Sequence, residues 1–406
     1  MRFFQKKFND IMKRLAIVTS HPIQYNAPWF ALLSKSEGIH VKVFYTWGQL
    51  QSELKFDPGF GKTVQWDIPL LEGYEYTFVD NVARAPGSHH RKGIINPSLN
   101  REIEQWEADA MLIFGWNFIS HLKCIRYFHK KIPVLFRGDS TLLDEKSGIK
   151  TSIRRIFLKW VYSKIDVAFY AGTNNKKYFL AHGLKNKQLV FAPHSVDNHR
   201  FAEPNELYQQ QAKALRKQLG IETQDIVLLF VGKMEQKKNP FFLVELLKRH
   251  GNPRLKVLFV GNGALENRLK ISASNDKRII MLNFQNQQQM PVIYRVADLV
   301  VLPSTGPGET WGMVLNEAMA CGKAVASSPG VGATVDLVHE RNGVVINFDD
   351  TTVIDGLVEK ALQNSFVLQQ MGQHSLVKIK QYSFEKIVNA VVSVIEDLKN
   401  TNLNPD

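Results

Sequence analysis

Short apolar runs recur along the whole chain, and each is followed by a polar or glycine-rich turn and then by apolar residues at helical spacing. Runs of this length are typical of buried strands, and their alternation with helices predicts parallel sheets covered on both faces. The predicted strands lie at 15–19, 41–45, 110–114, 134–136, 166–170 and 190–192, and then at 226–231, 255–260, 279–282, 297–302, 324–327 and 344–346. We therefore expect an α/β protein with two doubly wound, Rossmann-like domains that face each other across a cleft.

Composition narrows the class of protein. The 406 residues are long enough for two domains, and 44% hydrophobic with 22% charged residues is typical of a soluble globular chain. No apolar run is long enough to span a bilayer, and no secretory signal is visible, so we expect a cytoplasmic protein. Cys124 and Cys321 lack metal-ligand spacing and are interpreted as buried thiols in a reducing compartment.

The net charge of +13 is unevenly distributed. Residues 1–200 carry 29 Lys and Arg against 17 Asp and Glu, whereas residues 201–406 carry 22 against 21. A basic surplus suits nucleic acid, an anionic membrane surface or a phosphorylated acceptor. We exclude nucleic acid because the chain has no recognised nucleic-acid module and no basic stripe interleaved with aromatic residues.

The first residues allow three interpretations. Basic residues alternate with apolar residues at helical spacing, namely Arg2, Lys6, Lys7, Lys13 and Arg14 with Phe4, Phe8, Ile11 and Leu15. This pattern fits an amphipathic helix on a membrane surface. It also fits a frayed tail over 1–13, and the sequence that follows Met12 resembles a bacterial translation start.

The stretch from Pro303 to Glu317 carries the most specific chemistry. A loop rich in Gly and Pro separates a predicted strand from a predicted helix, so free backbone N–H groups and the positive end of a helix dipole suit phosphate oxygens. Two carboxylates, Glu309 on the loop and Glu317 on the helix, have seven residues between them and suit the vicinal hydroxyls of a sugar. The pattern indicates a phosphorylated sugar; the alternative is a loop with solvated carboxylates.

The same stretch resembles a known family. The E-x7-E pattern, with Gly-Glu-Thr-Trp-Gly in front and Asn-Glu-Ala-Met-Ala-Cys-Gly behind, is similar to the donor-site signature of glycosyltransferase family 4, which contains retaining enzymes of GT-B fold. The resemblance implies that Glu309 holds hydroxyls of the transferred sugar and that Glu317 holds the nucleotide ribose. It also implies that the backbone N–H groups of Gly312, Met313 and Val314 face the diphosphate.

A second motif follows the strand at 226–231. There Gly232 precedes clustered lysines at a helix start, which suits a diphosphate because cations and helical N–H groups both bind its oxygens. The family has a basic residue directly after this glycine and a Lys five positions later, which correspond to Lys233 and Lys238. The first is more commonly Arg, so bidentate binding is lost here while the charge is kept. A solvated turn is the alternative.

The other candidate residues are less specific. Gly261 and Gly263 lie where a nucleotide would approach the backbone, and the resemblance implies that Phe284 and the Gln285 backbone hold the base. In the first half, family members often have a Gly-rich loop where this chain has His-Pro-Ile-Gln-Tyr. The remaining candidates are His21 and Gln24 for the acceptor and Arg137 with Asp139 near the transferred sugar; a structural His21 and a salt-linked turn at 137–139 are the alternatives.

Two further segments of the first half remain open. Residues 46–100 read as a long irregular loop rich in aromatic residues, which suits either a sugar or lipid-phosphate acceptor or plain packing. Ile153 to Tyr162 is predicted as a core helix whose outer positions include Arg154, Arg155 and Lys159. A membrane contact is the alternative for that helix.

These patterns and the resemblance predict an N-terminal acceptor-binding domain at 1–200, a C-terminal nucleotide-sugar-binding domain at 201–380 and a helix at 381–406 that crosses back, with a linker near 195–215. The expected activity is retaining, metal-independent transfer of a hexose from a nucleotide-diphosphate sugar, UDP-linked rather than GDP-linked, without any cofactor. The expected acceptor is a sugar or lipid-linked oligosaccharide in bacterial surface polysaccharide synthesis, with peripheral contact to the inner face of the cell membrane. The alternatives are a non-catalytic nucleotide-sugar-binding subunit and, less favoured, a GT-B phosphorylase or an epimerase.

Overall fold

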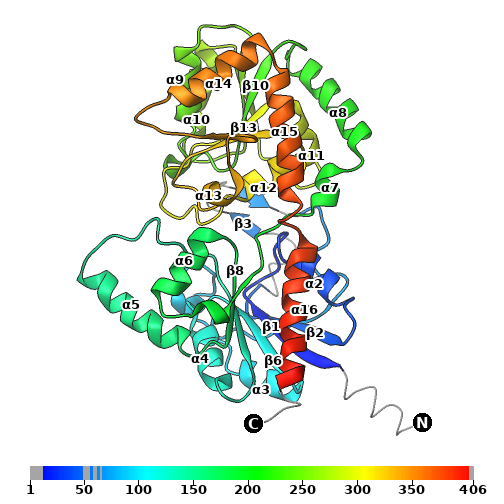
Figure 1. The fold of residues 1–406 in the computed structure, drawn as a ribbon, viewed down its shortest axis with the longest axis vertical. Coiled ribbons are helices and arrows are strands. Elements are labelled where there is room, and N and C mark those ends of the chain that lie inside the picture. Colours follow the sequence, from blue (N-terminus) through cyan, green and yellow to red (C-terminus); the bar gives the residue numbers. More distant parts are fainter. Residues whose placement is uncertain (1–11, 49–54, 58–61, 65, 402–406) are drawn as a thin grey trace. The chain divides into compact units, whose positions relative to one another are not determined.

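The computed structural model describes residues 12–48, 55–57, 62–64 and 66–401 (Figure 1). By their contacts the described residues form two compact units. Unit 1 consists of those within 1–53, 69–193 and 384–406, and unit 2 of those within 54–68 and 194–383. The chain passes into unit 2 between Pro193 and His194 and returns between Ser383 and Phe384, whereas the sequence placed these boundaries at 200 and 380.

Unit 1 is built on a seven-stranded parallel sheet of order β5-β2-β1-β6-β7-β8-β9. Its strands are β1 (Lys13–Thr19), β2 (Ile39–Tyr45), β5 (Glu75–Phe78), β6 (Ala110–Phe114), β7 (Val134–Arg137), β8 (Val167–Tyr170) and β9 (Leu189–Phe191). The central strands are apolar at successive positions because both faces of a parallel sheet are covered by helices.

The helices of unit 1 include one from the far end of the chain. They are α2 (Ala27–Leu33), η1 (Arg91–Gly93), α3 (Leu99–Gln105), α4 (Ile119–Phe128), α5 (Ile149–Tyr162), α6 (Thr173–Ala181), η2 (Asn186–Gln188) and α16 (Phe384–Thr401). Helix α16 lies along α2 and contributes Ile387, Val391 and Ile395 to the same buried cluster as Leu15 and Ile17 of β1 (Figure 1). The last helix is therefore part of the unit 1 core.

Unit 2 is built on a six-stranded parallel sheet of order β12-β11-β10-β13-β14-β15. Its strands are β10 (Ile226–Val231), β11 (Leu255–Val260), β12 (Ile279–Leu282), β13 (Leu299–Leu302), β14 (Ala324–Ser327) and β15 (Gly343–Val345). A separate antiparallel pair, β3 (Lys55–Asp57) and β4 (Lys62–Val64), comes from the first half of the chain but belongs to unit 2.

The helices of unit 2 cover both faces of its sheet. They are α7 (Asn198–Ala202), α8 (Asn205–Gln218), η3 (Gln236–Lys238), α9 (Phe241–Arg249), α10 (Glu266–Asn275), α11 (Met290–Val296), α12 (Met313–Ala320), α13 (Thr334–Leu337), α14 (Thr352–Gln363) and α15 (Phe366–Ile379). One buried cluster joins β10, β11 and β13 to α9, α14 and α15. The expected class, two doubly wound α/β sheets, is confirmed unit by unit.

The structure corrects three expectations about particular segments. The stretch near 195–215 is not a linker, because α7 and α8 form there and pack within unit 2. The described part of 46–100 is not one continuous irregular loop, because the short elements β3, β4, β5 and η1 and the start of α3 interrupt it, although most of it lies outside regular elements. The pattern before Met12 lies outside the described residues, as does the loop between β3 and β4.

The third correction concerns α5, which was expected to be a core helix with a basic outer face. It is longer than predicted and buries only Leu158, Val161 and Tyr162. Large apolar side chains, Ile153 and Ile156 among them, are exposed instead. Periodicity alone could not reveal this, because the helix has apolar residues on two opposite faces. Within the described residues, no helix combines the length and the apolar character needed to cross a bilayer.

Candidate functional site

The topology of the unit 2 sheet brings two predicted motifs together. The chain runs from β10 outward through β11 and β12 and then returns to place β13 on the other side of β10. The loops that follow β10 and β13 therefore leave neighbouring strands at the point where strand order reverses, which is where open α/β sheets bind ligands. The first loop carries Lys233 and Lys238, and the second carries Glu309.

Lys238 and Glu309 form an ion pair in this place. The Lys238 ammonium contacts the Glu309 carboxylate, and both side chains are largely but not fully buried, with 17% and 13% of their surface exposed. Ser304 Oγ donates to the same carboxylate at 3.1 Å. The Thr305 N–H donates to the Lys237 carbonyl at 2.8 Å, which holds the two loops together through their backbones. The site thus holds opposite charges next to each other and partly open to solvent.

Close packing fixes the conformation of the Glu309 loop. Gly312, the residue before α12, has φ of 100°, and a Cβ there would lie 2.7 Å from Val331 and 2.9 Å from Leu302. A Cβ on Gly332 would lie 1.7 Å from the Thr310 carbonyl oxygen. The Gly332 N–H donates to the Glu309 carbonyl at 2.9 Å. The loop after β14 therefore supports the Glu309 loop, and only glycine fits at both contact points.

Helix α12 begins directly after this loop. Met313 and Val314 are its first residues, and the first N–H groups of a helix have no partner within the helix. Glu317 lies one turn further along and is only 3% exposed. Its carboxylate accepts a hydrogen bond from the Tyr294 hydroxyl at 2.6 Å. The structure thus gives Glu317 a buried partner on α11, while Glu309 lies at the partly open end of the helix.

Gly261 and Gly263 lie beside the loop that follows β10. A Cβ on Gly261 would lie 2.0 Å from the Gly232 carbonyl oxygen, and one on Gly263 would lie 2.7 Å from the Met234 backbone nitrogen. Both glycines have positive φ, at 139° and 154°. The contact between the two loops is thus sufficient to explain both glycines, and it brings the backbone after β11 next to Lys233.

Phe284 and Gln285 follow β12 at the edge of the same sheet. The Phe284 N–H donates to the Asn262 side-chain oxygen at 2.9 Å, which ties this loop to the one after β11. The Phe284 ring lies edge-on to Trp66, with ring centroids 6.4 Å apart. The side-chain Nε2 of Gln285 donates to the Asn283 carbonyl at 3.0 Å. The loops after β10, β11, β12 and β13 therefore meet along one edge of unit 2.

The predicted residues of unit 1 lie on different strands. His21 follows β1, where its Nδ1 lies 2.9 Å from Ser20 Oγ and its ring lies edge-on to Trp47. Gln24 is in the turn before α2. Arg137 ends β7, which is separated from β1 by β6, and Asp139 is exposed in the loop that follows. Unit 1 therefore does not gather these four residues at a single point of its sheet.

Arg137 has a structural set of partners. It is 5% exposed, and its two terminal nitrogens donate to the carbonyls of Ala192 and Pro193 at 2.8 and 2.9 Å. Burial lowers the pKa of Arg137 to about 10, against the opposing effect of Asp139. These bonds fix the end of unit 1 where the chain leaves it, and they occupy the guanidinium.

A buried polar network lies at the same edge of unit 1. Asn96 donates to three backbone carbonyls, including those of Thr46 and Val79. His121 Nε2 lies 3.0 Å from Thr46 Oγ1, and its Nδ1 donates to the Phe114 carbonyl at 2.9 Å. Burial lowers the pKa of His121 to about 4. The strand ends of unit 1 thus direct several polar side chains to the backbone.

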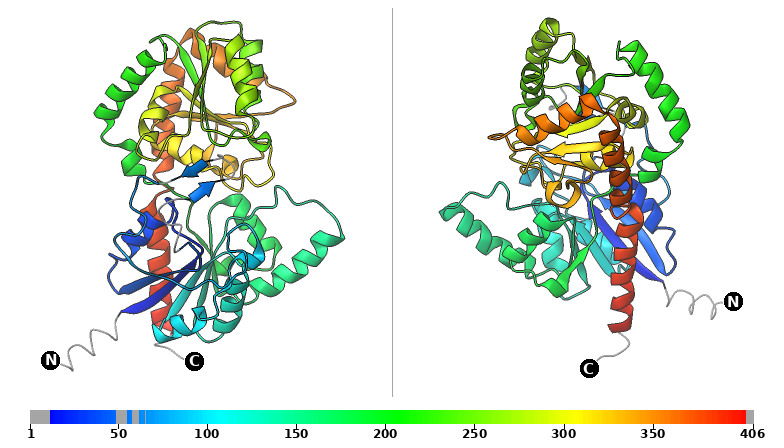
Figure 2. Two further views of the ribbon diagram at one scale, coloured as in Figure 1. Left: turned by 180° about the vertical axis from the view of Figure 1, so that it is seen from behind. Right: turned by 45° about the horizontal axis from the view of Figure 1, so that its top comes forward.

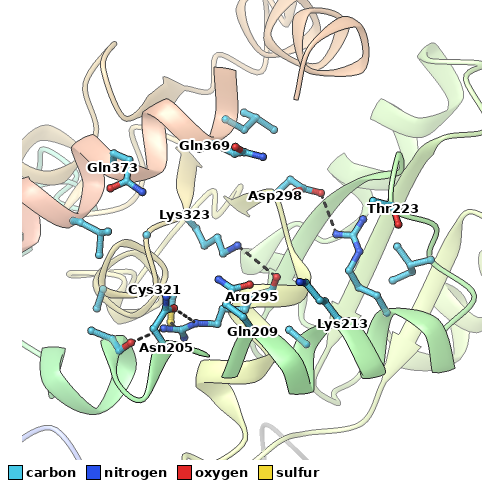
Figure 3. Close-up of a pocket in the computed structure, with 18 of the residues that line it drawn as sticks. Asn205, Gln209, Lys213, Thr223, Arg295, Asp298, Cys321, Lys323, Gln369 and Gln373 are labelled. Carbon is cyan, nitrogen blue, oxygen red and sulfur yellow. Dashed lines mark hydrogen bonds and ion pairs between the residues drawn. The ribbon is translucent and has the colours of Figure 1, made fainter. Parts of the chain in front are cut away.

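A large cavity in unit 2 lies away from the predicted residues. It has a volume of about 1,100 Å³ and lies between α8, α15 and the C-terminal end of α12 (Figure 3). Arg295 donates to the carbonyls of Pro291 and Ala202, Arg216 donates to the Val296 carbonyl, and Lys323 points toward the Arg295 carbonyl. These cations bind backbone carbonyls, and none of the residues predicted to bind the nucleotide sugar lines the cavity.

Several residues at the Lys238–Glu309 edge were not found from the sequence. Ser304 and Tyr294 bind the two predicted carboxylates, and Asn262 connects two of the loops. The sequence signal at Gly332 was visible as a Gly-Val-Gly turn after a strand, although its contact with the Glu309 loop was not. Among the described residues, no three His, Cys, Asp or Glu side chains lie together in a way that could hold a metal ion.

Comparison with known sequences finds similar proteins for the C-terminal part of the chain. Residues 211–401 match the family described as Glycosyl transferases group 1. D-inositol 3-phosphate glycosyltransferase of Gordonia bronchialis is 29% identical over 192 residues, which is 44% of this chain and 42% of that protein. An uncharacterized glycosyltransferase of Methanocaldococcus jannaschii is 26% identical over 188 residues, 44% of this chain and 47% of that protein. The chain thus matches less than half the length of these relatives.

Comparison with solved structures covers nearly the whole chain. HepE of Anabaena in complex with UDP aligns with a TM-score of 0.70 and 16% identity over 95% of this chain and all of that one. WaaG, a glycosyltransferase involved in lipopolysaccharide biosynthesis, aligns with a TM-score of 0.63 and 16% identity over 94% of this chain and 99% of that one. Identities this low establish the fold alone. The match of residues 211–401 to the glycosyl transferases group 1 family agrees with the resemblance of the donor-site motif, and the chain has the GT-B fold.

Proposed function

We propose that this chain is a glycosyltransferase that moves a hexose from a nucleotide-diphosphate sugar to a hydroxyl acceptor. The observation that carries the proposal is the Lys238–Glu309 pair at the edge of the unit 2 sheet. An ammonium beside a carboxylate suits a ligand with an anionic half and a hydroxyl-rich half, because each half finds its own partner. A nucleotide-diphosphate sugar is such a ligand.

Each group has a defined task in this proposal. Lys238 and Lys233 bind the diphosphate together with the N–H groups of Gly312, Met313 and Val314. Glu309 accepts hydrogen bonds from hydroxyls of the sugar, and Glu317 accepts them from the ribose. Gly261 and Gly263 let the backbone approach the nucleotide, while Phe284 and the Gln285 backbone hold the base.

The lysines would act most strongly as the donor bond breaks. The bond between the anomeric carbon and the diphosphate oxygen cleaves, and its electron pair leaves with the diphosphate. The acceptor oxygen forms the new bond to the same carbon and gives its proton to the departing diphosphate oxygen. Negative charge therefore grows on the diphosphate in the transition state, where positioned cations and N–H groups stabilise it. On these grounds we propose that the lysines and α12 supply this stabilisation without a metal ion.

The finer assignment rests on the family resemblance and the neighbours. We propose that transfer retains the anomeric configuration by attack on the face from which the diphosphate leaves. UDP is the proposed nucleotide, because HepE of Anabaena binds UDP and UDP-glucose. His21 and Gln24 are the proposed acceptor-side residues, and Asp139 is proposed to act near the transferred sugar. Arg137 was expected beside Asp139, but its bonds to two backbone carbonyls favour a structural task. Bacterial surface polysaccharide synthesis at the inner face of the membrane is the proposed setting.

A thermal-shift screen tests the donor site. Purified protein is heated with UDP, GDP, ADP, CMP and the matching sugar nucleotides, with and without EDTA. A ligand at about a hundredfold its Kd stabilises the folded state by about 2.7 kcal/mol, so selective binding gives a readable rise in Tm. We expect a rise with UDP that EDTA does not change; no rise with any nucleotide would refute the donor site.

Two further measurements test the stereochemistry of transfer and the alternative that the chain binds a nucleotide sugar without catalysis. The anomeric configuration of the product, read by NMR from an acceptor-supplied reaction, decides between retention and inversion. A non-catalytic nucleotide-sugar-binding subunit is the second candidate, and it predicts the same thermal shift without turnover. Slow donor hydrolysis in the absence of acceptor, lost in Lys238→Ala but kept in Lys237→Ala, would exclude that candidate.

A further inference from the structure

Helix α5 exposes four large apolar side chains. Ile149 is 81% exposed, Ile153 62%, Ile156 70% and Trp160 40%. Their spacing is that of one helix face, because at about 100° per residue they fall within roughly 60° of arc. We call these four residues the α5 stripe. Single exposed apolar residues are ordinary, but four in one row are not.

The stripe lies opposite the face by which α5 packs on unit 1. Leu158, Val161 and Tyr162 are buried on that packed face. The α5 helix lies at the outside of unit 1 in every view (Figure 2). The stripe therefore does not belong to the hydrophobic core, and the fold of unit 1 gives no reason for its apolar character.

Basic side chains flank the stripe on both sides. On the helical wheel Lys150 lies on one side of the stripe and Lys159 on the other, with Arg154 and Arg155 further round toward the packed face, and all four are exposed. From residue 146 to residue 164 the chain has six Lys and Arg and no Asp or Glu. Arg155 pairs with Glu145, while Lys164 and Arg126 lie over the Trp160 ring with their charged groups 5.3 and 5.7 Å from its centroid.

We propose that the α5 stripe inserts into the surface of an anionic lipid bilayer, with α5 lying parallel to it. An exposed apolar row between two basic rows matches the boundary between acyl chains and anionic headgroups. The partly exposed Trp160 suits the headgroup level, where Trp is enriched. A protein partner would have to supply an acidic groove, whereas an anionic bilayer supplies acyl chains and negative charge over any length of helix.

Vesicle sedimentation tests the proposal with the full chain. Sucrose-loaded vesicles of phosphatidylcholine with phosphatidylglycerol are compared with vesicles of phosphatidylcholine alone. We expect tighter partition to the anionic vesicles, weakened as salt is raised. The double variant Ile153→Glu/Ile156→Glu should lower the partition coefficient at least about tenfold. Because these side chains are exposed, the variant should unfold at the same temperature as the parent.

A matched control separates the stripe from exposed apolar surface in general. Phe366 and Val377 are 54% and 67% exposed on α15 of unit 2, and Phe366→Glu/Val377→Glu should bind vesicles as the parent does. If the α5 double variant is unstable, Lys150→Glu/Lys159→Glu provides the second test, with loss of preference for anionic vesicles expected. Unchanged partition of the stripe variants would overturn the proposal.

The remaining outcomes are also decisive. A dimer in sedimentation velocity without lipid, converted to monomer by Ile153→Glu/Ile156→Glu, would mean that a second copy covers the stripe and would overturn the membrane proposal. The inference does not rest on the donor site. The thermal shift with UDP should be the same in the parent and in the stripe variants, so failure of one proposal leaves the other standing.

Discussion

The carboxyl ends of the two sheets use polar side chains in opposite ways. In unit 2, Lys238 and Glu309 form an ion pair at a partly open edge of the sheet, so each charged group contacts another side chain. In unit 1, Arg137, Asn96 and His121 are buried and directed to backbone carbonyls. Two parallel sheets with a similar strand order thus differ in whether these strand-end side chains bind the backbone or remain available to a ligand.

The partner of a polar residue at a strand end indicates its role better than its position does. Position at the carboxyl edge of a parallel sheet is shared by both groups and does not discriminate between them. What discriminates is the partner: an arginine bound to two carbonyls stabilises a loop, whereas a charge pair with partial exposure can exchange partners when a ligand arrives.

The largest loss of turnover is expected at the Lys238–Glu309 pair of unit 2. Glu309→Gln and Lys238→Ala should each lower turnover by about a hundredfold or more, because each removes a charged group from the reacting centre. Lys237→Ala is the matched control, since its side chain is 42% exposed and pairs with Glu235. Turnover is measured as release of nucleoside diphosphate, with circular dichroism to verify folding. Parent-like turnover in either site variant would remove the proposed mechanism.

Arg137 should behave in the opposite way. Arg137→Met leaves two buried carbonyls without donors, so the free energy of unfolding should fall by about 2–4 kcal/mol in urea titrations. Nucleotide binding to unit 2 should be unchanged in calorimetry. Arg101, which is exposed on α3, supplies the control, and Arg101→Met should cost less than about 0.5 kcal/mol. Full stability with lost turnover would instead assign Arg137 to catalysis and break the comparison.

His121 makes unit 1 sensitive to acid. Its folded pKa of about 4 lies below the usual value of 6.5, so between these values the unfolded state binds a proton that the folded state excludes. Stability should therefore fall as the pH falls from about 6.5 toward 4, by up to about 1.4 kcal/mol per pH unit. Urea unfolding across this range measures the slope. His121→Gln should flatten it, and an unchanged slope would mean that other groups carry the effect.

The smallest effect is expected at the buried end of the donor site. Tyr294→Phe removes the hydroxyl that donates to Glu317, and we expect nucleotide affinity to fall a few-fold, in line with about 1 kcal/mol for one hydrogen bond. Tyr127→Phe is the control, because Tyr127 makes an equally short hydroxyl–carboxylate bond to Glu104 on the exposed surface of unit 1. Calorimetric titration with UDP compares them. Equal affinity in the parent and Tyr294→Phe would leave Glu317 without a measurable part in binding.

The sequence predicted unit 2 more closely than unit 1 for a physical reason. The motifs of unit 2 include local backbone constraints, such as the positive φ of Gly312 directly before α12, so the residue types themselves indicate the conformation. The fold class and the two charged loops followed from those signals and from the alternation of strands and helices. Ser304, Tyr294 and Asn262 act through contacts between loops far apart in sequence, and no local pattern reports such contacts.

In unit 1 fewer local sequence signals indicate which side chains are buried. The partners of Arg137 lie 55 and 56 residues away in sequence, so its burial could not be read from its neighbours. The two apolar faces of α5 illustrate a different limit. Helical periodicity shows that a row of isoleucines shares a face, but only the packing shows that this face is the one turned away from the sheet.

The position of α16 in unit 1 has a consequence for synthesis on the ribosome. The buried cluster around β1 and β2 includes Phe384, Val388 and Val394, which are made after unit 2, because nearly all of unit 2 lies in the continuous stretch from His194 to Ser383. The ribosome therefore delivers everything unit 2 needs before it delivers the helix that closes unit 1. Most of unit 1 is thus translated before unit 2 but completed after it, and Leu15 and Ile17 need protection until α16 has been made.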